Sequence, residues 1–114
     1  MQTPSKRTHR VAELIQTTLA DLLKKSVHDP RLKNVTMTHV KLTSDFSTAT
    51  LFFSLSEENE QSIKDAQNAF QKAAGFFRHQ LSQQIELRHT PKLIFKYDQT
   101  AAHAERISHF LKGC

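Results

Sequence analysis

The sequence predicts an α+β two-layer sandwich, in which amphipathic helices cover one face of a small sheet. Two observations lead to this class. The length of 114 residues suits one domain with a single modest core. Helical and strand periodicities also follow one another in the order helix, strand, strand, helix, helix, strand and a final short helix. Because no repeat or linker divides the chain, residues 1–114 are expected to form one domain, ordered over about 5–112.

The first predicted helix runs from about Ser5 to Ser26. Pro4 and Ser5 are helix-start signals, and the segment His28-Asp29-Pro30 ends the helix. The apolar residues between these limits recur at helical spacing: Val11, Leu14, Ile15, Leu19, Leu22 and Leu23.

A β-hairpin is predicted next. The segment Val35 to Leu42 is rich in β-branched residues, but its apolar phase shifts after Met37, so a β-bulge is expected near Thr38 or His39. After a polar turn over residues 43–47, the segment Thr48 to Ser54 alternates in the manner of a half-buried strand.

A second helical region begins near Ser56 to Glu60, where acidic residues suit the positive end of a helix dipole. One apolar face then runs through Ala73 and past Gly75 as far as Ile85. A glycine inside a helix costs roughly 0.5 to 1 kcal/mol relative to alanine. Two interpretations fit this pattern: a single long helix, or two helices joined at a kink.

Thr90-Pro91 is expected to end the helical region and to start a third strand, Lys92 to Tyr97. Its alternation places Leu93, Phe95 and Tyr97 on one face and Lys92, Ile94 and Lys96 on the other. A last short helix is predicted over about Ala101 to Leu111, with Gly113 as a C-terminal stop.

The charge distribution indicates a polyanionic partner. The net charge of +5 is divided into +5 over residues 1–41, −3 over 42–75 and +3 over 76–114. Nucleic acid is the commonest partner of such a basic surface, although the same charge also serves solubility. The candidate RNA-binding residues, interleaved with Phe76 and His79, are the following cations: Lys6, Arg7, Arg10, Arg31, Lys33, Arg78, Arg88, Lys92 and Lys96.

The motifs of enzyme, metal and cofactor chemistry are missing from the sequence. The one cysteine, Cys114, allows neither a disulfide framework nor a four-thiolate metal site, and a reducing cytoplasm fits this usage. The seven histidines lack the i, i+4 pairing of zinc ligands on one helix face, and there is no glycine-rich phosphate loop. No apolar run is long enough for a membrane span. We therefore expect a cytoplasmic, non-catalytic protein without metal or cofactor.

Several segments, in this order, resemble the bacterial ribosome-binding factor A family over about residues 5–112: RTHRVAELI, DPRL, VKLTSDF followed by ATLFFS, AAGFFRHQL, LRHTPKLIFKYD and RISHFL. The resemblance implies a KH-like fold of type II topology. It also implies binding to the free small (30S) ribosomal subunit and 16S rRNA, with a role in late maturation and in processing of the 16S rRNA 5′ end.

In this family an Ala-x-Gly kink replaces the Gly-x-x-Gly loop of ordinary KH modules, and it falls here on Ala73, Ala74 and Gly75. On that basis Gly75→Ala is expected to straighten the joint and weaken the fold or its docking. Family members often carry a longer charged C-terminal tail, whereas this sequence stops at Cys114.

Two other functions are considered beside RNA binding. A small nuclease would need clustered carboxylates or a histidine pair near the basic face, and the sequence shows neither. A protein-binding adaptor would use the acidic start of the second helix or an edge strand of the hairpin, and this could coexist with RNA binding. Other maturation factors are possible partners, and a monomer is expected.

Overall fold

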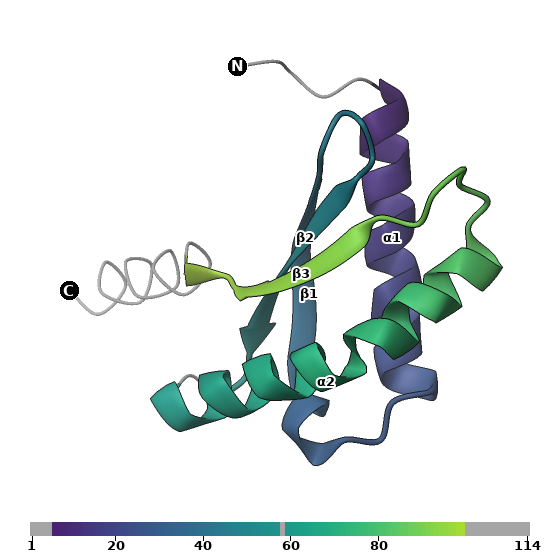
Figure 1. Ribbon diagram of the computed structural model, residues 1–114. Coiled ribbons are helices and arrows are strands. Elements are labelled where there is room, and N and C mark those ends of the chain that lie inside the picture. The colour runs from purple at the N-terminus through teal and green to yellow at the C-terminus, as the bar shows by residue number, and fades with distance from the viewer. Residues whose placement is uncertain (1–5, 58, 100–114) are drawn as a thin grey trace.

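The computed structural model describes residues 6–57 and 59–99. Figure 1 shows the elements in chain order: α1 (Lys6–Lys25), the short 3₁₀ helix η1 (Pro30–Leu32), β1 (Val35–Leu42), β2 (Thr48–Leu55), α2 (Glu60–Gln84) and β3 (Lys92–Tyr97). The α+β class and the KH-like element order are therefore confirmed, with one long helix between β2 and β3. The predicted last helix, Ala101 to Leu111, lies outside the described residues.

The three strands form one sheet in the order β1-β2-β3. β1 and β2 are antiparallel, and the register shifts between Met37 and His39, which confirms the predicted bulge. β2 and β3 are parallel, from Thr48 beside Lys92 to Phe53 beside Tyr97. Parallel neighbours need a crossover connection, and α2 supplies it.

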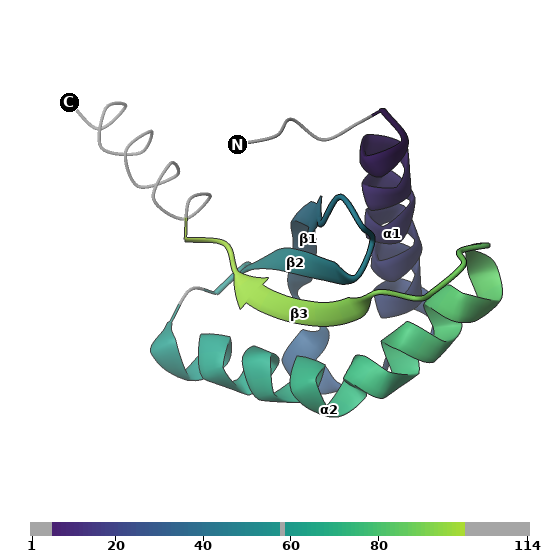
Figure 2. The ribbon, with the colours of Figure 1, turned by 45° about the horizontal axis from the view of Figure 1, so that its top comes forward.

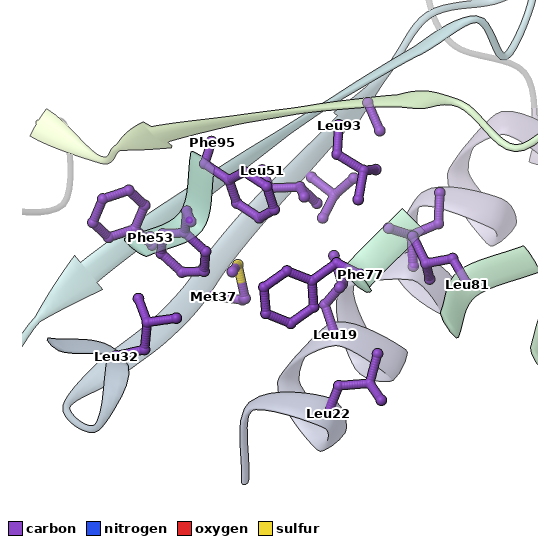
Figure 3. Packing of buried hydrophobic residues seen from close by; sticks show 14 of the residues in the cluster. Leu19, Leu22, Leu32, Met37, Leu51, Phe53, Phe77, Leu81, Leu93 and Phe95 are labelled. Atoms are coloured by element: carbon purple, nitrogen blue, oxygen red, sulfur yellow. The ribbon is translucent and has the colours of Figure 1, made fainter. Parts of the chain in front are cut away.

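Both helices contribute to one core on a single face of the sheet. Ile15 and Leu19 of α1 and Phe70 and Phe77 of α2 are fully buried in the same cluster as alternate residues of all three strands. Figure 2 shows α2 running along this side of the sheet, and Figure 3 shows Phe77 and the strand residues directed into the shared core. The described residues place no helix on the opposite face, whose side chains are exposed or half-buried.

Aromatic packing joins α2 to the sheet. The ring of Phe70 stacks on that of Phe95 at 4.4 Å with only 7° between their planes, and it also lies 4.9 Å from the ring of Phe53. The side-chain amide of Gln67 donates a hydrogen bond to the carbonyl of Phe95. These contacts fix the position of α2 along β3.

α2 is one continuous helix from Glu60 to Gln84, so of the two interpretations the structure has the single long helix, without a break at Gly75. Its axis nevertheless bends near the middle (Figures 1 and 2). Because buried residues before the bend, such as Phe70, and after it, such as Leu81, belong to one core, the bend lets both halves follow the sheet. Ala73 and Ala74 are half-buried against that core.

Neither the backbone conformation nor the space around position 75 requires a glycine there. Gly75 is exposed and has no positive φ, and a Cβ placed on it would meet no atom within 4 Å. The expectation that Gly75→Ala would weaken the fold therefore has no steric or backbone basis.

The start of α2 agrees with the sequence and its end does not. The side-chain carbonyl of Asn59 caps the helix by accepting from the N–H of Ser62 at 2.8 Å. The helix ends at Gln84, well before Thr90-Pro91, because Ile85 is buried in the core with an extended backbone. An irregular connection over residues 85–91 results.

Candidate nucleic-acid interface

A basic cleft of about 700 Å³ lies where four segments distant in sequence meet. These segments are the start of α1, the β1–β2 turn, the second half of α2, and the connection after α2 together with the start of β3. We define the basic cleft by the residues that line it: Arg7, Thr8, Ser44, Asp45, Phe46, Ser47, Arg78, Leu87, Arg88, His89, Thr90 and Lys92.

The β1–β2 turn forms one wall of the basic cleft and is held by its own side chains. The Thr43 hydroxyl accepts from the N–H groups of Ser47 and Thr48 at 3.1 and 3.0 Å. The Asp45 carboxylate accepts from the N–H and the hydroxyl of Ser47 at 3.1 and 2.8 Å. Short polar side chains that bond to nearby backbone are typical of tight turns, and here they give the wall a defined shape.

Phe46 sits at the tip of this turn in a left-handed conformation, with φ of 62°. This conformation is uncommon for a bulky residue. The ring is half-buried against the core, and the guanidinium carbon of Arg7 lies 5.2 Å from its centroid. At this distance the contact is a cation–π interaction, which orients Arg7 at the rim of the basic cleft.

The opposite wall is tied to α2 and to the turn. The Arg78 Nη2 donates to the carbonyl of Thr90 at 3.1 Å, so the connection after α2 is held against the helix. The N–H of Lys92 donates to the carbonyl of Ser47 at 2.9 Å, which joins β3 to the β1–β2 turn. Arg88 and His89 are exposed, directly precede Thr90 in the chain, and also line the basic cleft.

The basic cleft is strongly positive. It holds four Lys/Arg side chains, and among the described residues no ion pair engages any of them. The one carboxylate in the lining is that of Asp45, whose pKa is lowered by hydrogen bonds from the Ser47 and Thr43 side chains. It therefore stays ionised, and its hydrogen bonds hold the β1–β2 turn. Guanidinium and ammonium groups that no described carboxylate neutralises are suited to phosphate oxygens, and Arg in particular offers bidentate donors.

The structure does not bring the nine predicted cations together in one surface. Arg7, Arg78, Arg88 and Lys92 line the basic cleft. Lys6 and Arg10 are exposed on the first turns of α1, close to Arg7 in the chain. Lys96 lies on β3, on the sheet face that no described helix covers.

Arg31 and Lys33 lie at the other end of the sheet, because they precede β1 whereas the β1–β2 turn follows it. Arg31 also pairs with Asp29: its Nε lies 3.0 Å from Oδ1 and its Nη2 lies 2.7 Å from Oδ2. These hydrogen bonds lower the pKa of Asp29 to about 2. The charge of Arg31 is thus partly neutralised by Asp29, which is also the N-cap residue of η1. Arg31 does not line the basic cleft.

Phe46 is one of the lining residues that the sequence pattern did not reveal as part of a site. Its signal was a single aromatic residue inside an otherwise polar turn. Phe76, by contrast, is 40% exposed on α2 while its neighbour Phe77 is buried. The exposed ring of Phe76 is therefore available for contact with a ligand.

Two features of the described residues bear on other site classes. Within residues 6–57 and 59–99, no three His, Cys, Asp or Glu side chains gather as metal ligands would. In the same part of the chain, no helix has both the length and the apolar character needed to cross a membrane.

Comparison with known proteins gives a consistent result. The family described as ribosome-binding factor A matches residues 7–111. A ribosome-binding factor A of Coxiella burnetii is 44% identical over 108 residues, covering 95% of this chain and 89% of the relative. One from Lactobacillus delbrueckii subsp. bulgaricus is 40% identical over 105 residues, covering 92% and 88%.

Solved structures show the same fold. The crystal structure of ribosome-binding factor A from Thermus thermophilus has a TM-score of 0.71 at 22% identity, covering 79% of this chain and 93% of that one. A homology model of the Thermus thermophilus factor, fitted into a cryo-EM map of its complex with the 30S subunit, has a TM-score of 0.63 at 23% identity, covering 77% and 91%. From these matches across nearly its whole length, the chain belongs to the ribosome-binding factor A family.

Proposed function

We propose that this protein is a non-catalytic assembly factor that binds the free 30S subunit by holding 16S rRNA phosphates in the basic cleft. Through this contact it assists late maturation of the subunit and processing of the 16S rRNA 5′ end. It acts in the cytoplasm, as a monomer, alongside other maturation factors.

The observation that carries the proposal is the convergence of Arg7, Arg78, Arg88 and Lys92 in one cleft. Such groups neutralise phosphates and position a protein on RNA. Phe46 and the Arg78–Thr90 hydrogen bond keep the cleft in shape before any ligand arrives, which lowers the entropy lost on binding.

The comparisons support the choice of ligand. The relatives that match most of the chain are named for binding the ribosome. The structure fitted into a 30S complex is that of a Thermus thermophilus protein with the same fold.

The direct test measures binding of the purified protein to free 30S subunits over a range of salt concentrations. The double variant Arg78→Gln with Arg88→Gln removes two cleft cations. Each lost phosphate contact lowers the slope of log K against log salt by about 0.7 to 0.9, so the pair is expected to lower it by roughly 1.4 to 1.8. We expect the affinity at low salt to fall on the order of 10- to 100-fold.

The matched control is Lys25→Gln with Lys64→Gln, which removes the same charge from exposed positions outside the cleft. It is expected to retain nearly all of the affinity and slope. Equal losses in the two double variants would refute specific use of the basic cleft, and would leave only an effect of net charge.

The maturation role is tested in cells that lack the native factor. Expression of the parent chain is expected to reduce precursor 16S rRNA with an unprocessed 5′ end, and the cleft double variant is expected to leave the precursor in place. If the cleft variant restores processing as well as the parent does, the basic cleft is not the functional surface.

A further inference from the structure

The face of the sheet opposite the helices carries an ordered pattern that the basic cleft does not use. Register places His39, Phe52 and Lys96 side by side across the three strands, and Lys41, Thr50 and Ile94 in the next row. We call this surface the open sheet face. An open face of an antiparallel pair is usually polar, so a phenylalanine at its centre needs an explanation.

Phe52 forms a flat aromatic platform on this face. Its ring stacks with the imidazole of His39 at 6.0 Å between centroids and 30° between planes. It is only half-buried, whereas its neighbours Leu51 and Phe53 are buried on the core side. Phe52 is therefore partly exposed between His39 and Lys96.

The charge of the open sheet face is positive and continues into the basic cleft. Lys41, Lys92 and Lys96 alternate with buried residues and so point to this side. Lys92 also lines the basic cleft and is the residue common to both surfaces. From Lys92 to Lys96 the strand rises about 13 Å, which carries the positive path from the cleft to the aromatic platform.

One carboxylate lies beside this path. Asp98, just past the end of β3, accepts a hydrogen bond from the Thr38 hydroxyl at 2.6 Å. Among the described residues, Lys41, Lys92 and Lys96 outnumber this carboxylate, and a polyanion is favoured over an acidic or neutral surface as the ligand.

We propose that the open sheet face binds a single-stranded RNA segment that leaves the basic cleft, with an unpaired base stacked on Phe52 and phosphates held by Lys41 and Lys96. Aromatic side chains on a sheet stack on unpaired bases, and flanking cations follow the backbone. This inference rests on the proposed function, which supplies the RNA in the cleft. The open sheet face would give the RNA a second contact with the protein, beyond the one in the basic cleft.

A protein partner fits this face less well. Phe52 and Ile94 are its main apolar side chains, and threonine, serine and lysine surround them. The buried centres of protein interfaces are depleted in lysine and serine. Unpaired RNA needs only one exposed ring and neighbouring cations.

The test uses a fluorescent tryptophan, because the chain has none of its own. In Phe52→Trp the indole takes the place of the ring, and a 12-nucleotide oligouridine is expected to quench its emission on stacking. Leu14→Trp, at a 47% exposed position on α1, is the control, and its emission should change little. Thermal melting of both variants checks that they are folded.

Two further variants measure the contribution to binding. Phe52→Thr places another residue of high strand propensity there but removes the ring, and it should weaken oligouridine binding about five- to a hundredfold. Lys96→Gln should lower the salt slope by about 0.7, while Lys25→Gln should leave it unchanged.

The outcomes separate this inference from the proposed function. If the cleft double variant loses 30S binding but Phe52→Trp is not quenched and Phe52→Thr binds oligouridine like the parent, the open sheet face is not an RNA contact. If the cleft variant binds 30S subunits normally, the proposed function fails first. A sedimentation shift from dimer to monomer in Phe52→Thr would identify a protein interface instead and overturn the inference.

Discussion

Replacing Gly75 with alanine is expected to stabilise this protein. The residue lies inside α2, its φ is not positive, and a Cβ there would meet open space. The substitution therefore adds no clash and removes the entropic disadvantage of glycine in a helix, which is roughly 0.5 to 1 kcal/mol.

The expected shift in melting temperature follows from the size of the chain. An unfolding entropy of about 2.1 cal/mol/K per residue gives about 0.24 kcal/mol/K for 114 residues. A gain of about 0.5 to 1 kcal/mol thus corresponds to a rise of roughly 2 to 4 °C.

The assay is thermal and urea unfolding followed by circular dichroism, with Lys72→Ala as the control. Lys72 is an exposed residue of the same helix, and lysine and alanine differ little in helix propensity, so Lys72→Ala should change the melting temperature much less. A lower melting temperature in Gly75→Ala would refute the reasoning. It would mean that the bend of α2 depends on the backbone freedom of glycine, in spite of the open space around the residue.

Three further predictions concern the core, an ion pair and catalysis. Phe70→Ala should lower the free energy of unfolding by about 3 to 5 kcal/mol in urea titrations, since the ring is fully buried between Phe53 and Phe95; a loss below about 1 kcal/mol would contradict the packing. The pKa of Asp29 is lowered to about 2 by Arg31, so its contribution to stability is present above its ordinary value of 3.8 and is lost as the pH falls through about 2. A ¹³C NMR titration of the carboxyl group should show this midpoint in the parent and a higher one in Arg31→Gln, which keeps the backbone N–H bond to Asp29 but loses the guanidinium. Purified protein incubated with precursor 16S rRNA and Mg²⁺ or Mn²⁺ should leave the RNA intact, and cleavage abolished by a point mutation would overturn the non-catalytic assignment.

The sequence was sufficient to predict the two long helices and three strands that the structure describes, with most of their limits, but not the short helix η1. The strand limits and the bulge at Thr38 follow from the alternation of side chains, which depends on neighbours in the chain. The first helix and the start of α2 also follow from local signals, such as the cap at Asn59. These features depend on short-range sterics and hydrogen bonds, so they can be read one segment at a time.

Only the tertiary structure decided how the functional side chains are grouped. Nothing in the sequence favoured any of the nine candidate cations over the others. The parallel pairing of β3 with β2 brings Lys92 into the same cleft as Arg7 and Arg78. Arg31 lies at the far end of the sheet and pairs with Asp29. The end of α2 at Gln84 depends in the same way on burial of Ile85 in a core shared with distant segments. Residue spacing sets the period of an element, whereas the packing of the whole core sets where that element stops and what its exposed residues meet.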